Sequence, residues 1–300
     1  MLCKKLAIFI KKLKEGWWEM NISLSIESFP LDSCTIQDMK HLLTEFGGSY
    51  STVLQEASWN QPNIRGFAVL AYTEEGQLIG FATSTDIVNL HHYEWSVFVH
   101  PEYRRMSIGS ALADGIHHGH EQRQAEGALA AFIENPDAEK FLQSLGYGPD
   151  FKEIQMAADS LKEIALPEGL SILPFDGRIE ELETLLVSAF DSDILPVIAF
   201  NQAEEGREIW VMKKDGELVA TATLVQEDGA LWLTAFAVDP AQQGKGYGKA
   251  FLLWSRYMAH IQGMEQIMLD VETANDALQI YRKSQFEPVQ TIAYWTKRKA

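Results

Sequence analysis

Residues 233–251 read Leu-Thr-Ala-Phe-Ala-Val-Asp-Pro-Ala-Gln-Gln-Gly-Lys-Gly-Tyr-Gly-Lys-Ala-Phe, an apolar run that leads through a glycine-rich segment into an amphipathic one. The pattern predicts a strand, a loop and a helix in that order. Gly244, Gly246 and Gly248 lack a Cβ, so the loop can turn sharply and present successive backbone N–H groups. Because the positive end of the helix dipole lies directly behind, such a loop is suited to a diphosphate.

Two other phosphate-binding loops do not match this segment. A Walker A loop needs GxxxxGK[ST], and a dinucleotide fold needs GxGxxG after its first strand with an acidic residue about 20 positions further on. Here the glycines follow the fourth strand of the predicted domain. Because glycine pairs also occur in ordinary turns, the pattern alone leaves both phosphate binding and a purely structural turn open.

The same order of patterns occurs twice, about 140 residues apart. A turn at Gly76 before Leu-Ile-Gly-Phe-Ala-Thr-Ser matches a turn at Gly216 before Leu-Val-Ala-Thr-Ala-Thr-Leu. The stretch Trp-Ser-Val-Phe-Val-His-Pro-Glu-Tyr-Arg-Arg-Met-Ser-Ile-Gly-Ser-Ala-Leu at 95–112 matches residues 233–251. Asn135 and Asn275, both suitable helix N-caps, each open a later helix. These separate matches indicate two copies of one fold.

Each copy is predicted to contain a strand, a helix, three strands, a helix, a strand, a helix and a last strand. Consecutive antiparallel strands followed by a crossover imply a mixed α/β (α+β) fold, in which a mostly antiparallel sheet is flanked by helices. In the second copy we expect strands near 170–175, 208–214, 217–226, 230–238, 265–272 and 286–296 and helices near 177–190, 246–262 and 275–284.

The chain is predicted to contain two domains, residues 21–157 and 170–300, joined by a linker at 158–169 where hydrophobic periodicity lapses. Residues 1–20 are treated as a leader. Residues 1–19 carry five lysines and two glutamates, whereas the whole chain has a net charge of −17. A basic amphipathic helix on a membrane surface is one interpretation. The other is that translation begins at Met20 and that the leader is not native or is disordered.

The spacing Gln243-x-x-Gly246-x-Gly248 resembles the [RQ]xxGx[GA] signature of the GNAT acetyltransferase superfamily. The likeness covers essentially residues 21–300 as two tandem copies, and it implies acetyl-CoA as a cosubstrate. By this resemblance the strand before the loop supplies main-chain contacts to the pantetheine arm, from Phe236, Ala237 and Val238. The loop would bind the pyrophosphate through Gln243, Gly244, Lys245, Gly246, Tyr247, Gly248 and Lys249. An amide of the same strand would polarise the thioester carbonyl, as an oxyanion hole does.

The resemblance also implies roles for two residues of the helix after the fifth strand. Asn275 matches the family's asparagine, a coenzyme-binding position, and Tyr281 matches its tyrosine. A thiolate leaving group with an ordinary pKa near 8.5 benefits from a proton donor, and a phenol with a pKa near 10 can serve within hydrogen-bond reach. Tyr281 is therefore the predicted general acid, although its position is also typical of an ordinary half-buried helix face.

A general base is not evident, because residues 230–237 contain no carboxylate. Glu272, at the end of the fifth strand, is the predicted catalytic candidate. Glu227 and Asp228 are alternatives that also fit a solvated turn. A chain of water molecules to bulk solvent would suffice if the amine binds partly neutral.

The first copy departs from the signature. Ser107 stands where the motif has glycine, and its Cβ restricts the backbone and crowds an approaching phosphate. Arg104 and Arg105 can partly compensate by pairing with phosphate. Phe141, aligned with Tyr281, cannot donate a proton, whereas Glu94 lies on the fourth strand where a base could sit. We therefore expect the first copy to be degenerate and the second to carry the chemistry.

Composition excludes several classes of protein. A chain with 42 acidic and 25 basic residues repels nucleic-acid phosphates and favours cationic acceptors. Two cysteines, without ligand spacing, predict neither a disulfide framework nor a metal site. His117, His118 and His120 do not all share a helix face, and we expect them on a solvated surface. No apolar run reaches the roughly 18 residues of a membrane span, so we expect a cytoplasmic protein without stable membrane insertion.

Together these features predict an acyl-CoA-dependent N-acetyltransferase. It would move an acetyl group from acetyl-CoA to a primary amine of a small molecule or peptide, by direct attack in a ternary complex. The alternative is a non-catalytic acyl-CoA-binding sensor or interaction module. The sequence leaves the acceptor and the oligomeric state open.

Overall fold

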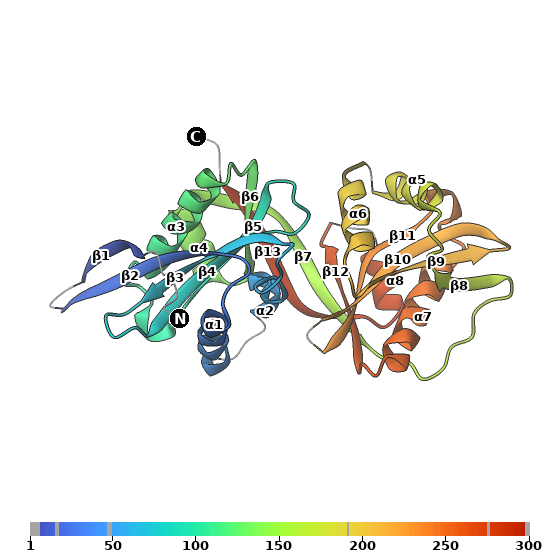
Figure 1. Cartoon of the computed structure of the whole chain (residues 1–300). Coiled ribbons are helices and arrows are strands. Elements are labelled where there is room, and N and C mark those ends of the chain that lie inside the picture. Colours follow the sequence, from blue (N-terminus) through green and yellow to red (C-terminus); the bar gives the residue numbers. More distant parts are fainter. Residues whose placement is uncertain are drawn as a thin grey trace. The chain divides into compact units, whose positions relative to one another are not determined.

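A computed structural model describes residues 7–15, 18–46, 50–190, 192–227, 229–274 and 277–297 (Figure 1). The chain forms two compact units. Unit 1 comprises Met1–Phe151 with Ile292–Ala300, and unit 2 comprises Lys152–Thr291.

Unit 1 contains one sheet with helices on both faces (Figure 1). Its strands lie side by side in the order β1 (Ala7–Glu15), β2 (Trp18–Ser28), β3 (Arg65–Tyr72), β4 (Leu78–Asp86), β5 (His92–Val99), β6 (Gly127–Ile133) and the end of β13 (Glu287–Lys297). Neighbours are antiparallel except β5 and β6, which are parallel. The helices are α1 (Ser33–Phe46), α2 (Ser51–Leu54), α3 (Ile108–Gln122) and α4 (Pro136–Ser144), with short 3-10 turns η1 (Glu56–Ser58) and η2 (Pro101–Tyr103).

Unit 2 repeats this architecture (Figure 1). Its strand order is β7 (Tyr147–Asp159), β12 (Gln266–Glu272), β11 (Ala230–Val238), β10 (Glu217–Glu227), β9 (Arg207–Lys214) and β8 (Leu170–Pro174). Here β11 and β12 form the parallel pair. The helices are α5 (Ile179–Ala189), α6 (Leu195–Ala203), α7 (Tyr247–Ile261) and α8 (Leu278–Lys283), with 3-10 turns η3 (Ser192–Ile194) and η4 (Pro240–Gln242).

Alternation along the strands of unit 2 produces two apolar faces. Leu231 and Leu233 of β11 pack with Phe251 of α7 on one face. On the other face Val211 of β9 packs with Leu182 of α5 and with Ile198 of α6. Burying each such side chain contributes about 1.5–3 kcal/mol, so the sheet is held from both sides.

The predicted fold class is confirmed, and the strands and helices of the second copy lie within a few residues of the predicted ranges. In the second copy, the helix that the sequence did not predict is α6. Its sequence, Leu-Pro-Val-Ile-Ala-Phe-Asn-Gln-Ala, carries an apolar run without polar periodicity, and proline occupies the first turn, where a missing N–H is tolerated.

The last strand of each repeat lies in the unit formed by the other repeat. Residues 153–159 of β7 pair with all of β12, whereas residues 292–296 of β13 pair with β6. Arg256 of α7 fastens the exchanged β7 by donating from Nε to the carbonyl oxygen of Asp159 at 2.8 Å. The predicted division into 21–157, 158–169 and 170–300 treats the repeats as self-contained. An alternating strand pairs equally well with either partner, so its pattern does not reveal the exchange.

The N-terminal segment differs from the amphipathic helix of the first interpretation. Ala7–Glu15 forms β1, which pairs antiparallel with β2, including Lys12 opposite Asn21. This part of the chain is therefore a strand and not an amphipathic helix. That translation begins at Met20 stays a prediction.

The histidines of α3 do not form the predicted solvated surface. His120 is buried and lies 2.7 Å, through Nε2, from Oγ of Ser84, and burial lowers its pKa to about 4. His117 is half-buried and its Nε2 lies 2.9 Å from the hydroxyl of Tyr147, while His118 is exposed. The reason is that α3 lies against the sheet of unit 1, so one helix face is enclosed.

Candidate active site

The glycine loop of unit 2 connects β11 to α7 through η4. The Asp239 carboxylate accepts a hydrogen bond from the amide of Ala241 at 2.9 Å and so fixes the first turn. Gln243 folds back, donating from Nε2 to the carbonyl oxygen of Val238 at 3.3 Å. The first contact shapes the turn that leaves the strand, and the second ties the loop back to the end of β11.

Gly244 and Gly246 adopt left-handed backbone conformations, with φ of +76° and +87°. A side chain at either position would be strained, since L-residues lose about 1–2 kcal/mol in this region. Among the described residues no atom lies within 4 Å of the position that a Cβ would take at either glycine. The backbone therefore favours glycine at both positions, and the space above them is open.

Gly246 is the N-cap of α7, and the first intrahelical bond runs from the amide of Ala250 to the carbonyl of Gly246 at 3.0 Å. The amides of Tyr247, Gly248 and Lys249 therefore precede the i to i−4 hydrogen-bond ladder. With the helix dipole and the lysines at 245 and 249, this end of α7 is suited to an anion.

A β-bulge interrupts β11 before the loop. The β10–β11 register runs from Glu227↔Ala230 to Thr223↔Thr234 and resumes at Thr221↔Ala237. Ala235 and Phe236 therefore both face the single residue Ala222, and Ala235 has φ of +47°. Non-glycine residues in this conformation cluster at functional sites, where the strain is retained for a purpose.

The bulge shifts the alternation of β11 by one residue. Leu233 faces α7 before the bulge, and Phe236 and Val238 pack in the same cluster after it. In the described chain, parallel pairing of β11 with β12 covers Leu231↔Ile267 and Trp232↔Met268 and ends before the bulge. The bulged backbone therefore lies where two parallel strands diverge, with amides that do not serve the regular ladder.

The corresponding strands of unit 1, β4, β5 and β6, show neither a bulge nor an open gap between the parallel strands in the described residues. The β4–β5 ladder, all of it within the described residues, runs from Gly80↔Val99 to Thr85↔Glu94 without a break. Ser96 donates to the carbonyl oxygen of Ala131 on β6 at 2.6 Å, which bridges the strands beyond their last parallel pair. The extra residue of 233–251 relative to 95–112 is thus the bulge.

The loop of unit 1 keeps the backbone of its counterpart with less suitable residues. Arg105 and Ser107 have φ of +64° and +57°, where unit 2 has glycines. Arg104 donates from Nε to the carbonyl oxygen of Val99 at 3.0 Å, the same tether that Gln243 makes. Both left-handed positions are therefore strained in unit 1, which supports a degenerate first copy.

Tyr281 lies on α8 within the apolar cluster under α7. Its exposed fraction is 8%, and its ring centroid lies 6.4 Å from that of Phe236. Burial raises the pKa of its phenol to about 12. The adjacent Ile280 approaches Gly248, where an added Cβ would meet its Cδ1 at 2.8 Å. The predicted acid, the bulged strand and the glycine helix are thus brought together.

The packing corrects one alignment. Phe141 contacts the Cβ position of Gly109 at 3.2 Å, as Ile280 contacts that of Gly248. The counterpart of Tyr281 is therefore Leu142, which is buried, and not Phe141. Neither side chain can donate a proton, so the interpretation of unit 1 is unchanged.

The remaining candidates are less closely associated. Glu272 is exposed at the end of β12, opposite Glu153 of β7. Glu227 ends β10, in the turn that leads to β11. Asn275 and Asp228 lie outside the described residues.

Asp270 is a residue that the sequence reading missed. It lies in the middle of β12, and its carboxylate accepts a hydrogen bond from Nε2 of Gln155 at 3.3 Å. The side chain is exposed, and desolvation by the surrounding strands together with the negative charge of Glu153 raises its pKa to about 7. The signal available in the sequence was an acidic residue between the apolar Leu269 and Val271 of a predicted strand.

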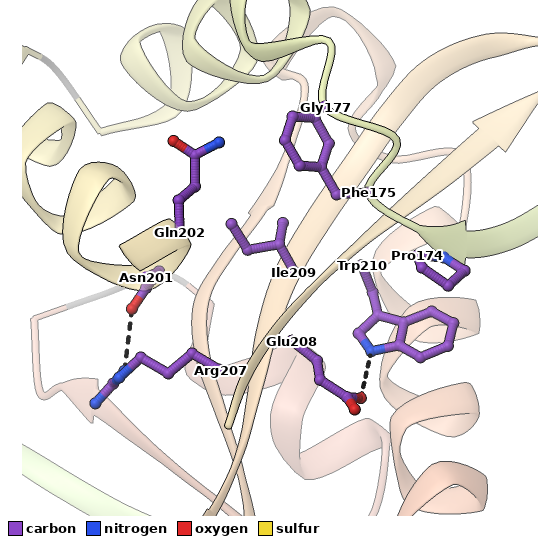
Figure 2. Close-up of a pocket in the computed structure, with 9 residues that line it drawn as sticks. All are labelled: Pro174, Phe175, Gly177, Asn201, Gln202, Arg207, Glu208, Ile209 and Trp210. Atoms are coloured by element: carbon purple, nitrogen blue, oxygen red, sulfur yellow. Dashed lines mark hydrogen bonds between the residues drawn. The ribbon is translucent and has the colours of Figure 1, made fainter. Parts of the chain in front are cut away.

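A hollow of about 450 Å³ opens where β8 ends beside β9 (Figure 2). Arg207 donates to Asn201 at 3.0 Å and the indole N–H of Trp210 donates to Glu208 at 3.2 Å. The charged side chains that line the hollow, Arg207 and Glu208, thus form hydrogen bonds with other lining residues. The residues described as lining it include none of the predicted site residues.

Comparisons with known proteins agree with this geometry. A model described as "Acetyltransferase (GNAT) family" matches residues 36–147, and one described as "Acetyltransferase (GNAT) domain" matches residues 205–288. A mycothiol acetyltransferase from Saccharomonospora viridis is 28% identical over 225 residues, which cover 65% of this chain and 71% of that protein. Another, from Nocardia farcinica, is 25% identical over 256 residues, 73% of this chain and 80% of that protein.

Two solved structures share the fold. A GCN5-related N-acetyltransferase from Sphaerobacter thermophilus has a TM-score of 0.70 at 18% identity, with 92% of this chain and 96% of that one covered. A tandem GNAT protein from the clavulanic acid biosynthesis pathway has a TM-score of 0.69 at 15% identity, with 92% and 99% covered. None of the helices in the described ranges combines the length and apolar character needed to cross a membrane.

Proposed function

The chain belongs to the GNAT acetyltransferase family, with two tandem GNAT domains, and from this premise we propose that it transfers an acetyl group from acetyl-CoA to a primary amine. The observation that carries the proposal is the combination, in unit 2, of a bulged strand with an open left-handed glycine loop at a helix N-terminus.

The chemistry follows from the elements around the bulge. Residues 243–249 would hold the diphosphate of acetyl-CoA, because their glycines leave the amides open to it. The main chain from Phe236 to Val238 would pair with the pantetheine arm. An amide freed by the bulge would donate to the thioester oxygen as negative charge develops there, and one such donor is worth about 10²–10³-fold in rate.

Tyr281 is the proposed general acid. Because burial raises its pKa to about 12, the phenol stays protonated throughout the neutral range. Its O–H is then available to the sulfur that leaves the acetyl group. Asn275 remains a proposed coenzyme contact on the strength of the family resemblance alone.

A small molecule is favoured as the acceptor. Two relatives are named for mycothiol, which favours a small-molecule amine over a peptide. The net charge of −17 favours an acceptor that carries positive charge. The cytoplasmic location, the absence of nucleic-acid partners and the dominance of unit 2 stay predictions.

Binding of acetyl-CoA tests the role of the loop. Gly246→Ala places a methyl group where the diphosphate approaches, so we expect the Kd for acetyl-CoA to rise about tenfold or more, measured by calorimetry, since one lost contact of about 1.4 kcal/mol is tenfold. Gly263→Ala is the matched control, because Gly263 follows the other end of α7 with φ of +75° and with similarly open space.

The control should lose similar stability and keep its affinity. Equal affinities in the two variants would contradict the assignment of the loop. Release of free thiol from acetyl-CoA with a panel of primary amines then separates the enzyme from the rival sensor. Binding without turnover for every amine would favour the sensor.

A further inference from the structure

We infer that Asp270 is the general base that accepts a proton from the acceptor amine, and that Gln155, on the strand exchanged from the first repeat, positions it. This inference rests on the proposed transfer to an amine. It replaces Glu272 with a residue at the centre of the sheet.

The strand geometry places Asp270 beside the bulge. In the parallel ladder Trp232 lies opposite Met268, so Thr234 and Asp270, two residues further along, stand at the same level. The next residue of β11, Ala235, begins the bulge. Asp270 therefore lies across the divergence of the two strands from the backbone proposed to hold the thioester.

Asp270 and Tyr281 approach that divergence from opposite faces. Leu269 and Val271, the neighbours of Asp270 in β12, are buried in the cluster under α7 that also contains Tyr281. Because side chains alternate along a strand, Asp270 points to the other face. A base on one face and an acid on the other allow the amine to enter and the thiol to leave on different sides of the carbonyl.

The exchanged β7 supplies the surroundings of the carboxylate. Gln155, with an exposed fraction of 2%, donates from Nε2 to Asp270 and accepts from Nε2 of Gln290 at 2.9 Å. The buried amide is thus held at both ends and fixes the direction of the carboxylate. Asp270 itself stays open to solvent along the strand surface, so an amine can reach it.

The charges around Asp270 suit a base at neutral pH. Among the described residues, the acidic groups on its face are Glu153 of β7 and Glu272 of its own strand. The strands β11 and β13 present the neutral Trp232, Thr234 and Gln290. Desolvation by the surrounding strands and the charge of Glu153 raise the pKa of this solvent-accessible carboxyl to about 7, and the hydrogen bond from Gln155 acts in the opposite direction. Such a carboxylate is ionised above neutral pH yet basic enough to accept a proton.

Two polar atoms beside Asp270 lack partners in the described part of the chain. They are Nε1 of Trp232 and Oγ1 of Thr234, and both atoms are buried. Buried polar groups are normally hydrogen-bonded, so unsatisfied ones call for a specific explanation. By strand alternation they belong to residues on the same face of the sheet as Asp270.

Asp270, Tyr281 and solvent account for every proton in the reaction. Asp270 takes one proton from the ammonium form, and the free amine attacks the thioester carbon. The N–C bond forms and the C–S bond breaks. The nitrogen loses its second proton through Asp270 once the first has passed to solvent, and sulfur receives a proton from Tyr281, which solvent replaces, so one proton is released per turnover.

The pH dependence of kcat/KM provides the test, with one primary amine that the wild type acetylates. We expect an acid limb near pH 7 in the wild type. Asp270→Asn should lower kcat/KM about 10²-fold or more at pH 7, and its rate should then follow the concentration of neutral amine. Asp159→Asn is the matched control, because Asp159 pairs with Gln266 at the far end of the same ladder, and it should keep both rate and limb.

Two further variants shift the limb in opposite directions if Asp270 is the titrating group. Glu153→Gln removes a negative charge, which lowers the pKa of Asp270 and moves the acid limb to lower pH. Gln155→Met removes the hydrogen bond to the ionised form and moves the limb to higher pH. A purely structural loss would reduce activity without moving the limb.

The outcomes separate this inference from the proposed function. Turnover by the wild type, with an acid limb that Asp270→Asn leaves in place, would overturn the inference alone. Loss of the limb in Glu272→Gln instead would assign the base to Glu272 and also overturn it. If the wild type binds acetyl-CoA but acetylates no amine, the proposed function fails and the inference fails with it.

Discussion

At the scale of single residues, Tyr281 and Asp270 are ionisable groups whose pKa values are both raised in unit 2. Burial under α7 raises the pKa of Tyr281, whereas desolvation by neighbouring strands and the charge of Glu153 raise that of the exposed Asp270. A carboxyl with a raised pKa reduces folding stability once it ionises, between its unfolded pKa near 3.9 and its folded value. Such a group is more easily explained by chemistry than by folding.

Tyr281→Phe tests the acid. Removing the hydroxyl should lower kcat by about 10²-fold or more, the usual scale for general acid catalysis, and leave the Kd for acetyl-CoA little changed. Tyr147→Phe is the matched control, since Tyr147 is a buried tyrosine of unit 1 whose pKa burial also raises to about 12. Steady-state kinetics on both variants decide the point, and an unaltered kcat in Tyr281→Phe would remove the residue from the mechanism.

At the scale of elements, β11 differs from β5 by one inserted residue. The β5 ladder pairs Val97 with Ala82 without interruption, whereas β11 places Ala235 and Phe236 opposite Ala222. One residue thus changes which amides face the sheet and which side chains face α7. A strand that serves only stability has no need of this strain.

Deleting Ala235 should convert β11 to the regular register of β5. The amides at the bulge would then return to the ladder, so we expect turnover to fall about 10²-fold or more, on the scale of losing an oxyanion donor. Because the diphosphate loop would be preserved, acetyl-CoA binding should weaken far less. Circular dichroism would show whether the sheet is intact, and unchanged turnover in a folded variant would contradict the role of the bulge.

Sequence patterns predicted the elements of unit 2 well because their signals are local. Gly76 and Gly216 were expected in tight turns, and both have positive φ, +82° and +93°. The bulge was visible only as an extra residue between 95–112 and 233–251, which does not say where the register breaks. Asp270 was missed because its neighbours come from β7, more than a hundred residues away.

At the scale of the whole molecule, the exchanged strands make the two repeats interdependent. Trp295, in the last strand of the second repeat, packs on Phe132 in unit 1 with ring centroids 5.6 Å apart. Phe286, nine residues earlier in sequence, is buried in unit 2 beside Tyr281. Neighbours in the sequence thus stabilise different units.

Two truncations of aromatic side chains test this exchange. Each should destabilise one unit by about 3–5 kcal/mol, the usual range for Phe or Trp replaced by Ala in a core. We expect Trp295→Ala to speed hydrogen exchange of amides in β5 and β6, and Phe286→Ala to speed that of β11 and β12. Faster exchange confined to unit 2 in both variants would mean that β13 stays with its own repeat.

The exchange also bears on how far a duplicated gene can diverge. A first copy that had kept its last strand for itself could lose its function and then be deleted. Here β7 pairs with β12 and brings Gln155 into unit 2, while β13 pairs with β6 and completes the sheet of unit 1. The loop of the first repeat can therefore accumulate substitutions, whereas its last strand cannot. Cleavage of the chain between β7 and β8 would leave two fragments that each need a strand of the other to complete a sheet.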